Sequence, residues 1–187
     1  MPALKAAGTA APTLHETMTR HHRKLIYLLG FMGCGKSTVG QLLAREAGWP
    51  FIDLDSTIEA GQGNSIREIF EKDGEPFFRR VEHAALTEAL KTEPAVIALG
   101  GGTWVQEPNM DLIHRTGGAT VWLDCSLNEL RRRCEGITNR PLFRSPESFA
   151  GLFSQRMPFY QLADFRVSTE GSAPEEVVER ILRLNIF

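Results

Sequence analysis

The sequence is poor in cysteine and lacks the spacings typical of disulfide-bonded or zinc-binding domains. Its three cysteines are Cys34, Cys125 and Cys134. They are odd in number and form neither a C-x-x-C pair nor a Cys/His cluster with zinc-ligand spacing. A disulfide scaffold and a zinc module are therefore excluded. We expect reduced thiols and a cytoplasmic location.

Long apolar runs and an excess of positive charge are also missing. The longest apolar stretch, residues 25–33, is much shorter than the roughly 20 residues of a transmembrane helix. The 187 residues include 21 basic and 23 acidic side chains, which give a net charge of −2. That balance excludes the strongly basic surface of many nucleic-acid-binding proteins. We expect neither a membrane nor a nucleic-acid partner, although a few arginines in a cleft would still suit an anionic substrate.

The pattern of apolar residues predicts one α/β domain after an N-terminal extension. Residues 1–24 are rich in Ala, Thr and Pro without an apolar period, and we expect them to be disordered. Residues 25–187 alternate short apolar strands with helical patterns, which predicts three layers: a parallel sheet with helices on both faces. Ligands would bind at the carboxyl ends of the strands. The expected strands are residues 25–29, 51–53, 95–99, 120–124 and 165–168. The expected helices are residues 37–47, 75–92, 109–115, 126–134, 152–160 and 174–185, with short helices within 58–69.

A phosphate-binding loop lies between the first strand and the first helix. Residues 30–37 read Gly-Phe-Met-Gly-Cys-Gly-Lys-Ser and match G-x-x-x-x-G-K-[ST] in the context that this motif requires. Glycines let successive N–H groups point at phosphate oxygens, and the following helix adds its positive end. Lys36 can reach the β- and γ-phosphates, and Ser37 can bind Mg²⁺. Cys34 fills a free position of the motif as a small residue.

Two carboxylates follow the second strand. If the chain stays extended, Asp53 and Asp55 lie roughly 6.6 Å apart on one face. They could divide the two acidic roles of phosphoryl transfer, one near Mg²⁺ and one at the acceptor hydroxyl. Alternatively, Asp55 caps a helix. Asp124, at the end of the fourth strand, is a rival magnesium ligand, and spacing alone does not choose between them.

Arginines and glycines further along the chain suggest a site for a carboxylate. Arg79 and Glu82 are spaced i, i+3, either as a solvated ion pair or as an arginine aimed at a substrate. Three glycines, residues 100–102, follow a buried strand and would let a ligand lie against bare backbone. Arg140 falls in an irregular segment typical of a lid over phosphates, and Arg156 in the helix after it.

Together these residues resemble the shikimate kinase family over about residues 25–185. The motifs occur in the family's order and are specific as a set: Lys36-Ser37-Thr38, Asp53-Leu54-Asp55, residues 65–70, Gly74-Glu75, Phe78-Arg79 with Glu82, residues 99–102, Asn139-Arg140-Pro141, and Arg156 through Tyr160. The resemblance implies a P-loop kinase fold with strand order 2-3-1-4-5. It also implies a substrate-binding segment at about 55–83 and a mobile lid at about 135–147. Residues 140–156 are about three residues shorter than in many relatives.

The resemblance further implies a reaction and the residues that carry it. The reaction is transfer of phosphate from ATP, with Mg²⁺, to the 3-hydroxyl of shikimate, by a monomer. Lys36, Asp55 and Arg140 would be catalytic, with Asp55 acting as the base or orienter. Ser37 and Asp53 would hold Mg²⁺. Nucleotide contacts would come from Gly33, Cys34, Gly35, Lys36, Ser37, Thr38, Arg133, Arg140 and Pro174, with Arg133 and Pro174 flanking the adenine. Shikimate contacts would come from Asp55, Phe70, Phe78, Arg79, Glu82, Gly100, Gly101, Gly102 and Arg156.

Two other functions remain open from the sequence. One is a kinase for another small hydroxy acid such as gluconate, although two arginines and an aspartate pair suit a rigid ring carboxylate better. The other is a nucleotide-binding protein without catalytic activity, which we would expect to lack the acids and arginines of an acceptor site.

Overall fold

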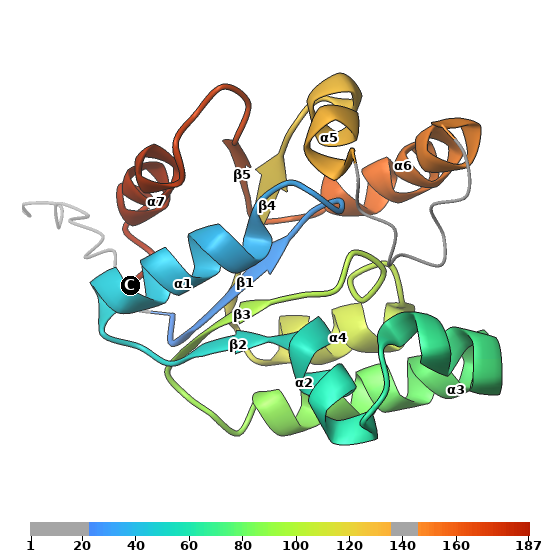
Figure 1. Ribbon diagram of the computed structural model, residues 1–187. Coiled ribbons are helices and arrows are strands. Elements are labelled where there is room, and N and C mark those ends of the chain that lie inside the picture. The colour runs from blue at the N-terminus through green and yellow to red at the C-terminus, as the bar shows by residue number, and fades with distance from the viewer. Residues whose placement is uncertain (1–22, 136–145) are drawn as a thin grey trace, which may run out of the picture.

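A parallel sheet forms the centre of the fold (Figure 1). In this computed structural model, which describes residues 23–135 and 146–187, the sheet has five strands in the order β2-β3-β1-β4-β5. The strands are β1 (Leu25–Leu29), β2 (Phe51–Asp53), β3 (Ala95–Ala98), β4 (Ala119–Asp124) and β5 (Phe165–Ser168). All four neighbouring pairs are parallel. The predicted α/β class and strand order are confirmed.

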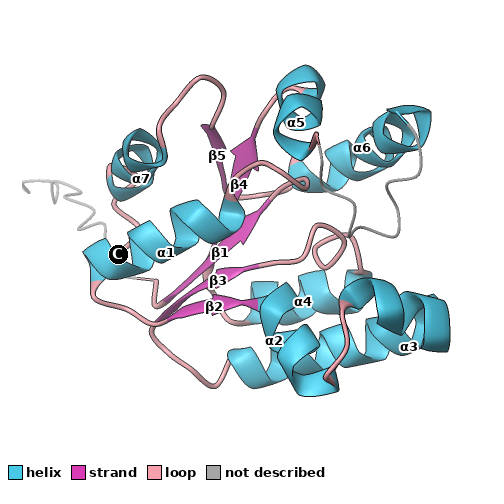
Figure 2. Ribbon diagram, viewed as in Figure 1, coloured by secondary structure: helices cyan, strands magenta, loops and turns pink. Residues whose placement is uncertain are grey.

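Helices cover both faces of the sheet (Figure 2). They are α1 (Lys36–Ala47), α2 (Leu54–Gln62), α3 (Ile66–Ala89), α4 (Glu107–Arg115), α5 (Leu127–Cys134), α6 (Pro146–Tyr160) and α7 (Pro174–Leu182). Helices α1 and α7 pack together on one face, and α3 and α4 lie side by side on the other (Figure 1). Because both faces are covered, every residue of β1 and β3 is buried. Among the described residues, no helix has the length and apolar character that a membrane crossing requires.

Helix α3 combines one of the short helices expected within 58–69 with the helix expected from residue 75. The expected helix at residue 75 is the second half of a longer element that starts at Ile66, with a capping box between Ser65 and Glu68. The two halves meet at Gly74, whose φ of 77° and ψ of 172° break the helical path just before Pro76. Gly74 and Pro76 therefore mark a kink inside α3. The short helices expected within 58–69 are α2 and the first part of α3. Similarly, α6 starts at Pro146 rather than at residue 152.

The two aspartates after β2 do not share one face of a strand, contrary to the expectation from their spacing. Strand β2 ends at Asp53, and the side chain of Asp53 accepts a hydrogen bond from the Ser56 N–H at 3.2 Å. Asp53, and not Asp55, is therefore the N-cap of α2. Asp55 lies in the first turn of that helix, where its carboxylate can point into the space beyond the sheet.

At the opposite, amino-terminal end of the sheet, Asp164 joins several segments. Its carboxylate accepts hydrogen bonds from the Thr120 N–H at 2.9 Å and hydroxyl at 3.1 Å, and pairs with Arg23 at 2.7 Å. Partial burial raises the pKa of Asp164, but the bonds from Thr120 and the charge of Arg23 outweigh it, so the pKa lies below its ordinary value of 3.8. The ionised form therefore stabilises the fold at neutral pH.

We expect Asp164→Asn to lower the urea midpoint of unfolding at neutral pH, because the variant loses the charged acceptor. The folded-state pKa is depressed, so the advantage of the parent protein is present above pH 3.8 and fades as the pH falls below it. Unfolding curves at several pH values check this. Glu179→Gln, which removes an exposed partner of Arg183, is the control and should change little. A deficit of Asp164→Asn that is constant with pH would contradict the assignment.

Candidate active site

The loop between β1 and α1 has the geometry of a phosphate cradle. Gly30, Gly33 and Gly35 have φ values of 140°, 80° and 99°, which L side chains rarely adopt. A Cβ on Gly30 would also lie 2.7 Å from the Leu123 carbonyl oxygen. The cradle opens at the N-terminus of α1, where helix N–H groups favour anions. The Lys36 ammonium folds back over the loop and donates to the carbonyls of Gly30 at 2.9 Å and Phe31 at 3.1 Å.

The hydroxyl and carboxylate expected to bind a metal lie beside this cradle. The Ser37 hydroxyl donates to Asp53 Oδ2 at 2.5 Å. A hydroxyl and a carboxylate are hard oxygen donors, which fit Mg²⁺. The rival acid Asp124 is not among the residues that line the space beside the cradle, and its carboxylate accepts two hydrogen bonds from Arg166 at 2.7 and 3.0 Å.

A large hollow of about 1220 Å³ extends from the cradle. Its lining includes Gly33, Gly35, Lys36, Ser37, Thr38, Asp53, Asp55 and Arg133. Arg133 is held by Glu129 at 2.8 Å and by the Thr169 carbonyl at 2.8 Å. Hydrogen bonds from Arg132 and Arg133 lower the pKa of Glu129 to about 2. Cys34 is buried and Pro174 begins α7, and neither lines this hollow. Arg140 lies outside the described residues.

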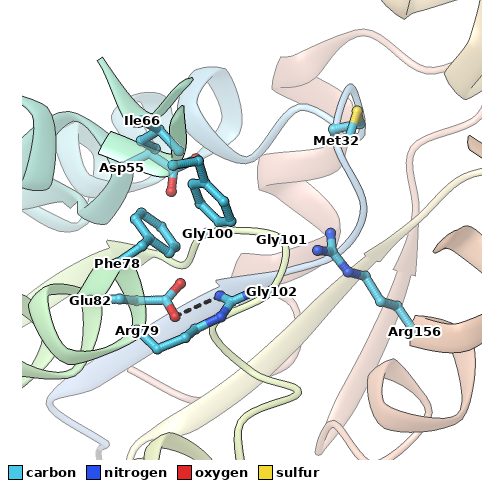
Figure 3. A pocket seen from close by; sticks show the side chains of 11 residues that line it. Met32, Asp55, Ile66, Phe78, Arg79, Glu82, Gly100, Gly101, Gly102 and Arg156 are labelled. Carbon is cyan, nitrogen blue, oxygen red and sulfur yellow. Dashed lines mark hydrogen bonds and ion pairs between the residues drawn. The ribbon is translucent and has the colours of Figure 1, made fainter. Parts of the chain in front are cut away.

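A second, smaller pocket of about 450 Å³ adjoins the first and shares Met32, Asp55 and Ile66 with it (Figure 3). It brings together all nine residues expected to contact an acceptor: Asp55, Phe70, Phe78, Arg79, Glu82, Gly100, Gly101, Gly102 and Arg156. These residues come from α2, α3, α6 and the loop after β3, so the fold gathers them from four separate segments. Asp55 lines both hollows and stands where they meet.

Two arginines reach into the smaller pocket from opposite sides (Figure 3). Arg79 donates from Nη1 to Glu82 at 2.8 Å, and from Nε and Nη2 to Glu75 at 3.1 and 2.9 Å. Burial lowers the pKa of Arg79, but the two carboxylates more than compensate and raise it. These bonds leave one N–H on each terminal nitrogen for a ligand. Arg156 is 7% exposed, and its guanidinium lies 5.7 Å from the centre of the Phe31 ring.

Each of the three glycines faces one of these charged groups. A Cβ on Gly100 would lie 2.5 Å from Asp55 Oδ1, and one on Gly101 would lie 2.9 Å from Arg156 Nη1. A Cβ on Gly102 would lie 3.0 Å from Arg79 Nη1 and 3.1 Å from Arg156 Nη2. The missing side chains therefore leave room between the two guanidiniums and beside the Asp55 carboxylate.

Sequence reasoning missed several residues of the site. Met32 and Ile66 line the smaller pocket, and Glu75 holds the outer edge of Arg79. The i, i+4 spacing of Glu75 and Arg79 was a usable signal for that pair. The apolar lining gave no signal, because Met32 and Ile66 are like ordinary core residues in the sequence.

The fold and the two adjoining hollows define a P-loop phosphotransferase, with a nucleotide cradle beside a pocket for a small anionic acceptor. Comparison with known proteins narrows this class. The family model for shikimate kinase matches residues 32–185. The chain belongs to the shikimate kinase family.

Individual relatives agree with this assignment. The shikimate kinase of Sulfurihydrogenibium sp. is 41% identical over 160 residues, which cover 85% of this chain and 96% of that one. The structure of the Acinetobacter baumannii shikimate kinase in complex with shikimate superposes with a TM-score of 0.81 at 35% identity, covering 86% of this chain and 91% of that one. The Aquifex aeolicus shikimate kinase gives 0.77 at 40% identity, covering 87% and 95%.

We expect Gly102→Ala to fold normally but to bind small carboxylates about tenfold more weakly. The added Cβ would meet only the ends of two flexible side chains, so the cost to folding is small, whereas both guanidiniums must shift by a few tenths of an ångström. Thermal unfolding and calorimetric titration with shikimate check the two halves of the prediction. Gly151→Ala on α6, where nothing lies within 4 Å of the new Cβ, is the control. Equal shikimate affinity in the two variants would contradict it.

Proposed function

We propose that the protein transfers the γ-phosphoryl group of ATP to the 3-hydroxyl of shikimate, giving shikimate 3-phosphate and ADP. The observation that carries the proposal is the pocket with two opposed arginines and the Asp55 carboxylate, which opens directly onto the phosphate cradle. A ring acid bound by its carboxylate between the arginines would turn its hydroxyls toward Asp55 and the cradle. Membership of the shikimate kinase family supports this choice of acceptor.

On this proposal, the nucleotide occupies the larger hollow. The backbone of residues 33–38 surrounds the β- and γ-phosphates, and Lys36 exchanges its bonds to the loop carbonyls for phosphate oxygens. Ser37 and Asp53 hold Mg²⁺, directly or through water, and the ion would neutralise charge on the phosphates. Arg133, which lines this hollow, contacts the adenine, and the base extends beyond the lining toward Pro174 at the start of α7. We assign the remaining phosphate contact to Arg140, as the family resemblance implies.

The acceptor is oriented by charge and by shape. Its carboxylate takes the two remaining N–H groups of Arg79 and pairs with the Arg156 guanidinium, while Glu82 and Glu75 keep Arg79 in place. The ring lies on the backbone of residues 100–102, with Phe70 and Phe78 beside it; the centres of these two aromatic rings are 4.6 Å apart. The 3-hydroxyl then points at the γ-phosphorus, next to Asp55.

Asp55 accepts the proton of the acceptor hydroxyl. As the new O–P bond forms and the bond to ADP breaks, the proton of the 3-hydroxyl passes to the Asp55 carboxylate. Lys36 and Arg140 stabilise the negative charge spread over the transferring group. Excluding water from the closed site prevents hydrolysis of ATP.

We also propose that the protein works as a monomer in the cytoplasm. The three cysteines are buried and form no disulfide, which suits a reducing compartment. The reaction as proposed needs residues of one chain only.

The decisive experiment measures ADP release from Mg²⁺-ATP with shikimate, gluconate, quinate or no acceptor. We expect release that depends on shikimate alone. Release with gluconate would retain the phosphate cradle but reject the carboxylate pocket as assigned. Intact ATP binding with no acceptor-dependent release would instead support a non-catalytic nucleotide-binding protein.

We expect Asp55→Asn to fold and bind ATP but to lose phosphoryl transfer by about two to four orders of magnitude, since the amide cannot accept the proton. Single-turnover rates and ATP titration check this. Asp73→Asn, which neutralises an exposed carboxylate on α3, should retain the parent rate. Near-normal turnover by Asp55→Asn would remove Asp55 from the mechanism.

A further inference from the structure

The loop between β3 and α4 (residues 99–106, the glycine loop) is hydrogen-bonded to both helices that carry the pocket arginines, α3 with Arg79 and α6 with Arg156. Several of the side chains that make these bonds lie outside the acceptor pocket. Thr103 is fully buried and uses each of its polar groups. Its N–H donates to the Gly100 carbonyl at 3.0 Å, its carbonyl accepts from Asn109 at 3.2 Å, and its hydroxyl donates to Glu82 Oε1 at 2.6 Å. Thr103 therefore joins the glycine loop to both α3 and α4.

The Thr103 hydroxyl acts on Arg79 through Glu82. The Glu82 carboxylate is 1% exposed, with Oε1 bound to Thr103 and Oε2 bound to Arg79 at 2.8 Å. A planar carboxylate held at both oxygens cannot rotate about its last side-chain bond. Without the hydroxyl, Oε1 would lose this donor while the carboxylate stays almost fully buried, and the carboxylate would turn to recover a partner. The guanidinium of Arg79 would turn with it.

The helix that carries Arg156 is linked to the same loop by Tyr160. The Tyr160 hydroxyl donates to the Gly101 carbonyl at 2.6 Å, and Tyr160 lies one helical turn beyond Arg156 on α6. Burial raises the pKa of Tyr160 well above its ordinary value, so the hydroxyl keeps its proton at neutral pH. The indole of Trp104 adds a second bond, from Nε1 to the Phe159 carbonyl at 2.8 Å.

We propose that the hydroxyls of Thr103 and Tyr160 are positioning groups that fix Arg79 and Arg156 to one loop and so set their separation for a carboxylate. Neither residue lines the smaller pocket, so both act through the arginines and not by touching the acceptor. This inference rests on the proposed function for the identity of the acceptor. It adds that carboxylate recognition depends on two buried hydroxyls outside the pocket.

The test uses pairs of variants that differ by one hydroxyl. Thr103→Val and Tyr160→Phe each remove one of the proposed groups, and Thr103→Ser restores the hydroxyl without the methyl group. Thr120→Val removes a hydroxyl that also donates to a carboxylate, that of Asp164, at the far end of the sheet. Tyr27→Phe removes a buried phenol oxygen that lies 3.0 Å from Thr116 Oγ1. These two controls match the chemical change and the loss of a buried hydrogen bond.

We expect Thr103→Val and Tyr160→Phe to raise the KM for shikimate about tenfold each, with the KM for ATP and kcat changed less than about twofold. Thr103→Ser should stay near the parent value. Thr120→Val and Tyr27→Phe should lower the melting temperature but leave both KM values unchanged. In the double variant the KM for shikimate should rise by less than the product of the two single increases, because both substitutions disturb the same pair of arginines.

A second acceptor isolates the carboxylate. With the shikimate analogue whose carboxylate is reduced to CH₂OH, we expect the parent and the two site variants to react equally slowly. If the variants slow both acceptors by the same factor, or raise the KM for ATP as much as that for shikimate, the hydroxyls serve general stability and the proposal is wrong.

A structure of Thr103→Val separates this proposal from the proposed function. If the parent protein does not phosphorylate shikimate, the proposed function fails, but the variant still tests the positioning. We expect Glu82 and Arg79 to be displaced in Thr103→Val and to return in Thr103→Ser. Unchanged positions of both side chains would overturn the proposal whatever the acceptor.

Discussion

The buried carboxylate of Glu82 is the constraint on which the acceptor pocket depends. An ionised carboxylate that is 1% exposed is costly unless each oxygen has a donor, and here Arg79 and Thr103 supply one each. Satisfying that charge joins α3 to the glycine loop, and the loop in turn meets α6 through Gly101. The position of one arginine is therefore tied to the packing of three segments far apart in the sequence. The bare backbone of residues 100–102 follows from the same arrangement. A side chain at Gly101 or Gly102 would occupy the space that the guanidiniums need, and one at Gly100 would meet the Asp55 carboxylate.

Local patterns made most of the fold predictable. The strand order followed from the family resemblance, and the phosphate loop from its motif together with the strand before it and the helix after it. The sequence failed where neighbouring residues compete for one role. Asp53 and Asp55 are both good helix caps, and only the point at which β2 ends decides that Asp53 caps α2. In α3, Gly74 and Pro76 mark the start of a new helical stretch after a kink, but nothing local shows that this stretch packs on from the helix before it as one element.

The residues of the site likewise include some that local sequence patterns reveal and others that they do not. The residues expected to contact an acceptor do meet in one pocket, because each belongs to a motif with a charge or a glycine. Thr103 and Tyr160 carry no such mark: a threonine after three glycines and a tyrosine late in a helix are ordinary residues until the structure shows their partners, 21 and 59 positions away. Hydrogen bonds over such separations have no local signature, and no pattern in the sequence points to them.

The charges around the acceptor pocket have a consequence for how an anion would be recognised there. Two guanidiniums, Arg79 and Arg156, stand among three carboxylates, Asp55, Glu75 and Glu82. Among the described residues that line the pocket the charges of Arg79 and Arg156 are balanced by those of Asp55 and Glu82, so anion recognition does not rest on a broad positive potential of the lining. On the proposed function, selection comes from a few N–H groups aimed at one small volume, with the neighbouring acids cancelling the field at longer range. Such a site discriminates by fit at short distance, and simple anions such as chloride or sulfate would gain little from it. Added salt would therefore compete poorly with a planar carboxylate of the right size.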